Sequence, residues 1–318
     1  MHIKNSKVMK KNGISASTFF AITLSFVMIF SFNACSSDSE DAISSGINDT
    51  KSEPTSNPYS LVIKTLAKGQ DITTKGAVKN ATLFVFNENN EFVKQINLDK
   101  SILLQRKAVS IDCPDSDRIT VIAWGGLSEG ENVASLDSAN IISDLKIQLQ
   151  QNNGVVTAAL GDLFYGQITL NRPVTKSSDI QTLNIERKVS SLAINTKGVN
   201  KKYGTTEGSY YYKVKKSKSS FNYNGELTGN EVEYIIPAYF NDNNELVTET
   251  TPILPAYNIV IELYRDNEMI FSSKNAKNGE ISSANAGEQV NVNFNITLNN
   301  CSIKVTPWNT IIQNVTVG

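Results

Sequence analysis

The side chains that most often carry out covalent or acid–base chemistry are scarce in this chain. Three cysteines (Cys35, Cys113 and Cys301) could supply thiolates, and the only histidine is His2. Because His2 precedes Cys35, a chain that began at Cys35 would have no histidine. That excludes Ser-His-Asp and Cys-His catalysis and histidine-ligated zinc. Carboxylate chemistry of the glycosidase type stays open in principle, but no spacing singles out a catalytic pair of acids.

Sequence motifs of enzymes and of cofactor sites are also missing. The chain has no P-loop, no dinucleotide fingerprint, no G-x-S-x-G elbow and no zinc-type pair of cysteines. We therefore expect a protein without enzymatic activity, catalytic residues or a cofactor.

Three polar clusters could in principle hold calcium through carboxylate and amide oxygens. They are NENNE (87–91), PDSDR (114–118) and NDNNE (241–245). None has the spacing of an EF-hand loop, and Asp and Asn are common residues of tight turns. We expect turns at all three and no metal site.

The balance of charge argues against nucleic acid as a partner. The chain has 30 basic and 31 acidic residues, and the four lysines that precede Cys35 are among the basic ones. Phosphate binding needs clustered positive charge, and the one basic run, KVKKSK (213–218), is short. Lysines also discourage pairing at a sheet edge, so we interpret this run as a solvated strand or loop edge.

The N-terminus has the pattern of an export signal. Lysines lie in residues 1–11, and an apolar segment, Ile14–Ala34, ends on a small residue directly before Cys35. The segment is just long enough to span a bilayer, so an uncleaved anchor is the alternative. Its Ser and Thr content and its end at a cysteine favour a signal peptide over residues 1–34. In an exported chain Cys113 and Cys301 could pair, but we expect both to be buried and free.

The position of Cys35 resembles the lipidated cysteine of bacterial lipoproteins. The preceding residues Phe32, Asn33 and Ala34 match the lipobox loosely, with only Ala34 fitting well. The residues that follow resemble the serine-rich acidic signal that directs lipoproteins of the Bacteroidota to the outer face of the outer membrane; they are Ser36, Ser37, Asp38, Ser39, Glu40 and Asp41. We expect acylation of Cys35, for example with palmitate. The alternative is a chance cysteine after a signal peptide.

The rest of the chain is patterned as β-structure. Residues 35–57 are too polar to bury a core and are expected to be a disordered tether. Residues 81–98 and 257–273 have the pattern of hairpins, and Val290, Val292, Phe294, Ile296 and Leu298 alternate with polar residues. Residues 135–149 could be a helix, because Ile141, Leu145 and Leu149 share a helical face. Many short strands predict antiparallel sandwiches. The polar stretch 172–179 suggests an N-terminal domain over 58–178 and a C-terminal domain over 179–318.

Several short motifs resemble the FimB/Mfa2 family of the Bacteroidota, the anchor subunits of fimbriae. They are LFVF with VIAWGG (83–126), GDLFYGQITL (161–170), IERKVSSLAI (185–194) and IKVTPW (303–308). The resemblance implies an all-β fold of two tandem transthyretin-like sandwich domains without enzymatic activity. It also implies a lipid-anchored, surface-exposed position at the base of a fimbrium (pilus). The motifs themselves are interpreted as core strands and turns without a ligand role.

The C-terminus suggests how such a subunit would join its partner, the fimbrial shaft subunit. In this broad family a terminal strand of one subunit completes the sheet of its neighbour. Residues 309–318 could be such a donor strand, with Ile311, Val315 and Val317 on one face and Ile312 on the other. The alternative is that they form the last strand of their own sandwich.

The first strand is expected to stay in place. Shaft subunits of the family lose theirs to an arginine-specific protease, whereas the first arginine of this chain is Arg106. Two other roles remain open: an accessory or tip adhesin of the same fimbria, and a surface glycan-binding lipoprotein. A glycan-binding protein needs exposed aromatic platforms, whereas Trp124 and Trp308 both lie within apolar strand patterns.

Overall fold

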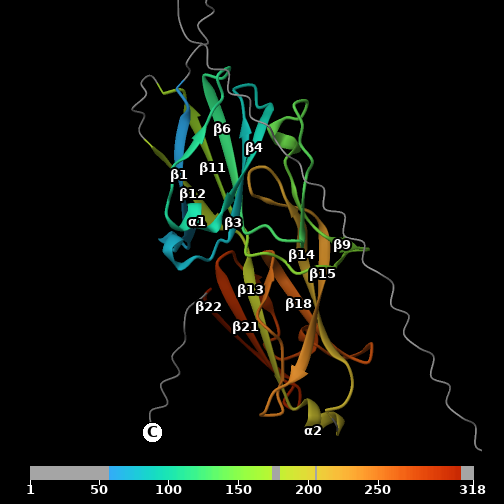
Figure 1. Ribbon diagram of the computed structural model, residues 1–318. Coiled ribbons are helices and arrows are strands. Elements are labelled where there is room, and N and C mark those ends of the chain that lie inside the picture. The colour runs from blue at the N-terminus through green and yellow to red at the C-terminus, as the bar shows by residue number, and fades with distance from the viewer. Residues whose placement is uncertain (1–56, 174–179, 205, 309–318) are drawn as a thin grey trace, which may run out of the picture. The chain divides into compact units, whose positions relative to one another are not determined.

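A computed structural model of the chain describes residues 57–173, 180–204 and 206–308, and these form an all-β structure of sandwiched sheets (Figure 1). The predicted fold class is confirmed. The expected signal peptide and almost all of the expected tether lie outside the described residues. The described helices are too short to cross a membrane. They are α1 (Lys100–Leu104), α2 (Val199–Tyr203), and the 3-10 turns η1 (Thr73–Lys75), η2 (Ile142–Asp144) and η3 (Ser273–Asn275).

The first sheet has the order β2-β1-β12-β11-β6-β3-β4, with β5 also paired to β1. Its strands are β1 (Tyr59–Ala67), β2 (Gln70–Asp71), β3 (Asn80–Phe86), β4 (Phe92–Asp99), β5 (Val109–Ile111), β6 (Arg118–Gly125), β11 (Phe164–Asn171) and β12 (Gln181–Arg187). All of its pairs are antiparallel except β1 with β12.

Along part of β3 and β6 both faces of this sheet are buried, although successive side chains of a strand point to opposite faces. On β3, Leu83 and Val85 belong to one core cluster, while Phe84 and Phe86 belong to another. The second cluster continues into the strands of the C-terminal half. This explains why LFVF is a continuous apolar run and not an alternating one.

The second group of strands has the order β19-β18-β14-β15-β16-β13-β21-β22. Its strands are β13 (Ser190–Lys197), β14 (Tyr210–Phe221), β15 (Leu227–Phe240), β16 (Leu246–Val247), β18 (Ala256–Arg265), β19 (Glu268–Ser272), β21 (Glu288–Asn295) and β22 (Asn300–Pro307). The side strands are β7 (Glu131–Val133), β8 (Ile147–Leu149), β9 (Gln151–Asn152), β10 (Val155–Val156), β17 (Thr251–Ile253) and β20 (Ile281–Ala284). The layers of β14 and β13 face each other, since the Tyr212 hydroxyl donates to Thr196 Oγ1 at 2.7 Å.

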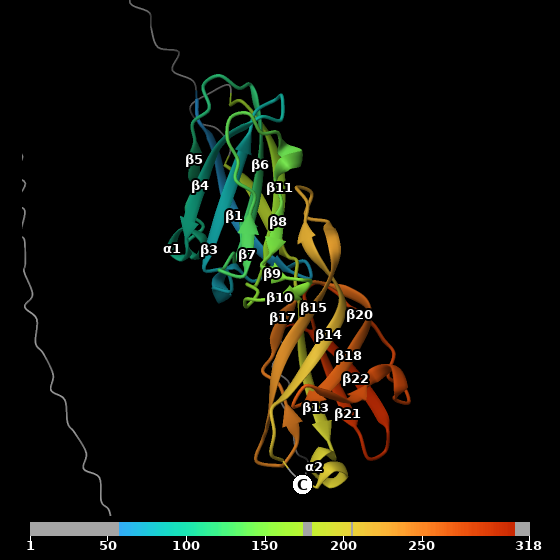
Figure 2. The ribbon, with the colours of Figure 1, turned by 90° about the vertical axis from the view of Figure 1, so that its right-hand side faces the viewer.

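The long hairpin of β14 and β15 joins the two groups of strands. Its outer end pairs with β8 through Phe221 and Ile147, and Figure 2 shows this end beside β8. The Phe221 ring lies 5.3 Å from the Trp124 indole of β6. The hairpin therefore completes the core over one face of the first sheet.

The chain passes from the first sheet to the second group of strands at Lys188 and Val189, because β12 pairs with β1 and β11 of the first sheet. The expected domain boundary after residue 178 stays a prediction. Two other sequence-based expectations need correction. The expected helix over 135–149 is wrong: this stretch contains η2 and β8, and Ile141 is 46% exposed. The alternation expected from Val290 to Leu298 ends early, because β21 ends at Asn295 and Leu298 is exposed.

Other expectations are confirmed. The two hairpins are β3 with β4 and β18 with β19. In NENNE the Asn87 side chain accepts the N–H groups of Asn89 and Glu91, which is a turn, and Asn241 does the same in NDNNE. Cys113 and Cys301 are both buried and free.

Candidate functional site at the end of strand β22

The predicted site residues lie at the two ends of the chain, outside the described residues. This holds for the acylation candidate Cys35, the export signal Ser36–Asp41, and the donor residues Ile311, Ile312, Val315 and Val317. The last described residue is Trp308, which follows β22. The structure therefore describes the point from which the expected donor segment starts, and the candidate site is built from there.

Trp308 is held at two places. Its backbone N–H donates to the carbonyl of Gly287 at 2.8 Å, which continues the pairing of β22 with β21 by one residue. Its indole lies on the guanidinium of Arg187, with Arg187 Cζ 4.5 Å from the ring centroid. Trp308 thus connects the end of β22 to the end of β12.

Arg187 is a buried cation at the end of the first sheet. Its side chain is 1% exposed and makes two parallel bonds to the Asp162 carboxylate, from Nε and Nη2, each of 2.8 Å. Phe164 provides a second aromatic ring, 5.0 Å from Arg187 Cζ. Burial raises the pKa of Asp162, and the bonds from Arg187 act in the opposite direction. The Nη1 atom is buried and has no hydrogen-bond partner among the described residues.

The loop that carries Asp162 is set by two glycines in close backbone contact. Gly126 has a φ of +76°, and a Cβ at this position would overlap the carbonyl oxygen of Asp162. A Cβ at Gly161 would in turn overlap the carbonyl oxygen of Gly126. The second glycine of VIAWGG (Gly126) and the first glycine of GDLFYG (Gly161) are therefore both required, because the two chain segments lie in close contact there.

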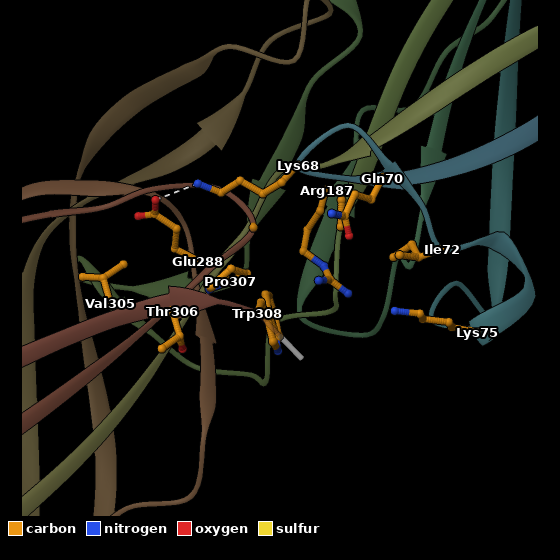
Figure 3. A pocket seen from close by; sticks show the side chains of 12 residues that line it. Lys68, Gln70, Ile72, Lys75, Arg187, Glu288, Val305, Thr306, Pro307 and Trp308 are labelled. Carbon is orange, nitrogen blue, oxygen red and sulfur yellow. Dashed lines mark hydrogen bonds and ion pairs between the residues drawn. The ribbon is translucent and has the colours of Figure 1, made fainter. Parts of the chain in front are cut away.

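A pocket of about 410 Å³ lies beside Trp308, between the turn that joins β1 to η1 and the strands β21 and β22 (Figure 3). Lys68 closes one side by an ion pair of 2.7 Å with Glu288. Burial acts to raise the pKa of Glu288, but its bonds from Lys68 and Asn285 outweigh this and lower it. Figure 3 shows the ends of Arg187 and Lys75 directed toward the same space.

One edge of β22 has, along part of its length, no strand partner among the residues that the structure describes. Alternate residues of an antiparallel strand direct their N–H and C=O groups to opposite sides. Trp308 N–H bonds Gly287 in line with β21, whereas Cys301 N–H points away and bonds the carbonyl of Lys277. Ile303 and Val305 share the direction of Cys301, and no described strand pairs with β22 on that side.

The arrangement joins the ends of β12 and β22 beside a pocket, and none of the described residues around it forms a nucleophile–base pair or a metal-ligand cluster. No cluster of His, Cys, Asp and Glu within residues 57–173, 180–204 and 206–308 could hold a metal ion. Burial raises the pKa of Cys113, and it raises that of Cys301 to about 11, so both thiols are poor nucleophiles near neutral pH. Neither tryptophan is a free platform for a sugar ring, since Trp124 is fully buried and Trp308 is stacked on Arg187.

Sequence reasoning did not find the pair of Arg187 and Asp162. It assigned their motifs to packing, and nothing in the spacing of these residues predicts the contact across two strands. A usable signal was the occurrence of an Arg and an Asp inside otherwise apolar motifs, because a buried charge requires a partner.

Comparison with known proteins gives one consistent result. A sequence model of the family described as fimbrillin-A associated anchor proteins Mfa1 and Mfa2 matches residues 52–314. The major fimbrium anchoring subunit FimB of Porphyromonas gingivalis is 23% identical over 273 residues, which are 80% of this chain and 88% of that protein.

Solved structures share the fold. The fimbrial anchor protein Mfa2 from Porphyromonas gingivalis superposes with a TM-score of 0.54 at 12% identity, covering 79% of this chain and 98% of that one. A Bacteroides thetaiotaomicron structure whose name proposes polysaccharide binding has a TM-score of 0.61 at 16% identity, covering 81% and 98%. At these identities the likeness concerns the fold alone.

Proposed function

The chain belongs to the family of fimbrillin-A associated anchor proteins, and we propose that it is a non-enzymatic subunit that anchors a fimbrium to the outer membrane. The observation that carries the proposal is the family match over residues 52–314. The fimbrial anchoring subunit among its relatives, which it matches over most of its length, supports the same role. The surface-exposed base of the fimbrium is the proposed location.

The proposed membrane attachment is acylation of Cys35. Each buried methylene contributes about 0.8 kcal/mol, so two or three acyl chains on one cysteine hold a protein firmly where one chain does not. The serine-rich acidic residues Ser36–Asp41 would direct the lipoprotein to the cell surface.

The first strand of this subunit is proposed to stay in place, so that no empty groove forms. β1 pairs with β12 on one side and with β5 and β2 on the other, and its Leu61 and Ile63 are fully buried. No arginine lies between Cys35 and β1. Arg106 follows α1, after the first four strands, so cleavage there would not release β1 alone.

The shaft subunit is proposed to receive residues 309–318 as an added strand. Main-chain hydrogen bonds would supply the pairing, and Ile311, Val315 and Val317 would fill its apolar groove. The hold on Trp308 supports this role, because a donated strand requires a firmly attached base.

The anchoring proposal is tested in the native bacterium with Cys35→Ala, and with Ser44→Ala in the expected tether as the control. Fimbriae on cells and in the medium are compared by electron microscopy and immunoblotting. We expect filaments to move into the medium with Cys35→Ala only. Filaments that stay attached in normal number and length would refute the anchor role and favour the tip adhesin or glycan-binding alternative.

Strand donation is tested separately. Deleting residues 309–318 should abolish joining to the shaft while the protein still folds. Val315→Lys should do the same, whereas Asn314→Lys, on the opposite face, should not. A deletion variant that folds and still joins the shaft would show that these residues are not the donor.

A further inference from the structure

The pocket beside Trp308 is lined by two cationic side chains, the buried Arg187 and the exposed Lys75. Arg187 is almost fully buried, and its Nη1 atom has no hydrogen-bond partner among the described residues. Lys75 lines the same pocket and makes no hydrogen bond or ion pair with a described residue, and its end is directed toward Arg187 (Figure 3). A buried donor without a partner is unfavourable, so this space is suited to an acceptor that enters from outside.

The acidic groups near the pocket do not supply that acceptor. Asp162 is bonded to Nε and Nη2 of Arg187, and Glu288 is bonded to Lys68 and Asn285. The remaining polar groups of the lining include the amide of Gln70 and the hydroxyl of Thr306, which can donate as well. A carboxylate fits this set, because it accepts several hydrogen bonds and its charge complements Lys75.

The end of β22, whose outer edge has no strand partner among the described residues, borders this pocket. Val305, Thr306, Pro307 and Trp308 all line it. Along this edge the N–H of Cys301 is already bonded to the carbonyl of Lys277, and Pro307 has no N–H to offer. Between these two positions, Ile303 and Val305 direct their N–H and C=O groups outward. The edge therefore offers a short stretch for strand addition with a pocket at one end, which is how strand-adding peptides gain both affinity and specificity.

We propose that this chain accepts an extended segment of a partner protein along the edge of β22, with an acidic side chain of that segment held in the pocket by Lys75 and Arg187. The segment pairs with the main chain of Ile303 and Val305. The inference is independent of the proposed anchoring function, because it concerns a strand that the chain receives and not one that it gives.

The probe is a set of ten-residue peptides of alternating Val and Ser, blocked at both ends, in which a single Glu is moved along the sequence. A matched set carries Gln in place of Glu. Binding to the full chain in detergent solution is measured by isothermal titration calorimetry. We expect one Glu position to bind best, and the corresponding Gln peptide to bind at least ten times more weakly.

Two substitutions in the chain assign the binding to the two parts of the site. Lys75→Gln should remove most of the difference between the Glu and Gln peptides, whereas Lys79→Gln, outside the pocket, should leave it unchanged. Val305→Pro removes an outward N–H without touching a bond to β21, so it should weaken the best Glu peptide and its Gln counterpart alike. Circular dichroism verifies that each variant is folded.

Each of the following results would overturn the proposal. The Glu and Gln peptides bind equally, or no peptide of either set binds. Lys75→Gln leaves the preference for Glu intact. Val305→Pro, correctly folded, binds the best peptide as strongly as the unchanged chain does.

Discussion

Removing Asp162 should destabilise the protein more than removing Arg187, although the two side chains form one ion pair. Asp162→Ala leaves the guanidinium of Arg187, 1% exposed, without a counter-charge. An uncompensated buried charge costs about 3–5 kcal/mol of unfolding free energy. Arg187→Met leaves a carboxylate that is 26% exposed and can reach water. The penalty for that acceptor is about 1–3 kcal/mol, and the Met side chain still packs between the two aromatic rings.

The double variant Asp162→Leu with Arg187→Met should be less destabilised than the sum of the two single variants (Asp162→Leu and Arg187→Met). Replacing both members of a buried pair by apolar residues leaves no unpaired charge. We expect a coupling free energy of about 2 kcal/mol, within the range found for residues in direct contact. The exposed pair of Lys216 and Glu231, at 3.0 Å, is the control, and its removal should change stability by less than about 1 kcal/mol.

Urea unfolding, monitored by circular dichroism and tryptophan fluorescence, measures these differences. Each difference appears as a shift of the midpoint at an unchanged slope. The reasoning is refuted if Asp162→Ala and Arg187→Met cost the same, or if the effects of Asp162→Leu and Arg187→Met simply add in the double variant. Either result would mean that the guanidinium is solvated or is satisfied by another group.

Three further outcomes are expected. Cys113 and Cys301 should not react with a thiol reagent at pH 8 until the chain is unfolded, because burial raises the pKa of both; rapid labelling of the folded chain would contradict this. Gly126→Ala should cost more than about 2 kcal/mol in urea unfolding, since left-handed strain adds to a backbone overlap, whereas Gly204→Ala, with φ +75° but open space, should cost about 1 kcal/mol; equal costs would refute the overlap. In an NMR titration Asp71 should show a pKa of about 2, because the backbone N–H and then the side chain of Thr73 stabilise its carboxylate. Since this pKa is lowered from 3.8, the contribution of Asp71 to stability is present above that pH and is lost as pH falls through about 2; a midpoint at 3.8 would contradict it.

Local pattern was enough to predict most individual strands. β3 and β4 are separated by a run of Asn and Glu, and the Asn87 side chain closes the turn by bonds to residues two and four positions on. These signals are local, so they survive without knowledge of the fold. The helix expected over 135–149 failed because short apolar runs do not distinguish periods of 2 and 3.6. Ile147 and Leu149 are both buried by strand alternation.

The boundary between the sheets depends on pairing that local pattern does not contain. The polar stretch 172–179 was a reasonable separator, yet β12 returns after it to pair in parallel with β1, more than a hundred residues earlier. The same limit applies to the candidate site. Arg187 meets Asp162 only because β11 and β12 are adjacent, and it meets Trp308 only because β22 ends beside β12.

The motifs that carry the family resemblance come together at this one place. VIAWGG supplies the glycine on which the Asp162 loop rests, GDLFYG supplies Asp162 and Phe164, IERK supplies Arg187, and IKVTPW supplies Trp308. Core packing alone would not require a buried cation held in a carboxylate fork between two aromatic rings, because apolar residues of similar volume are often at least as stabilising. Such an arrangement fixes an orientation. Two bonds of fixed geometry and two stacked rings hold the end of β22 in one orientation relative to the first sheet. A subunit proposed to give residues 309–318 to a shaft needs that orientation more than it needs the stability.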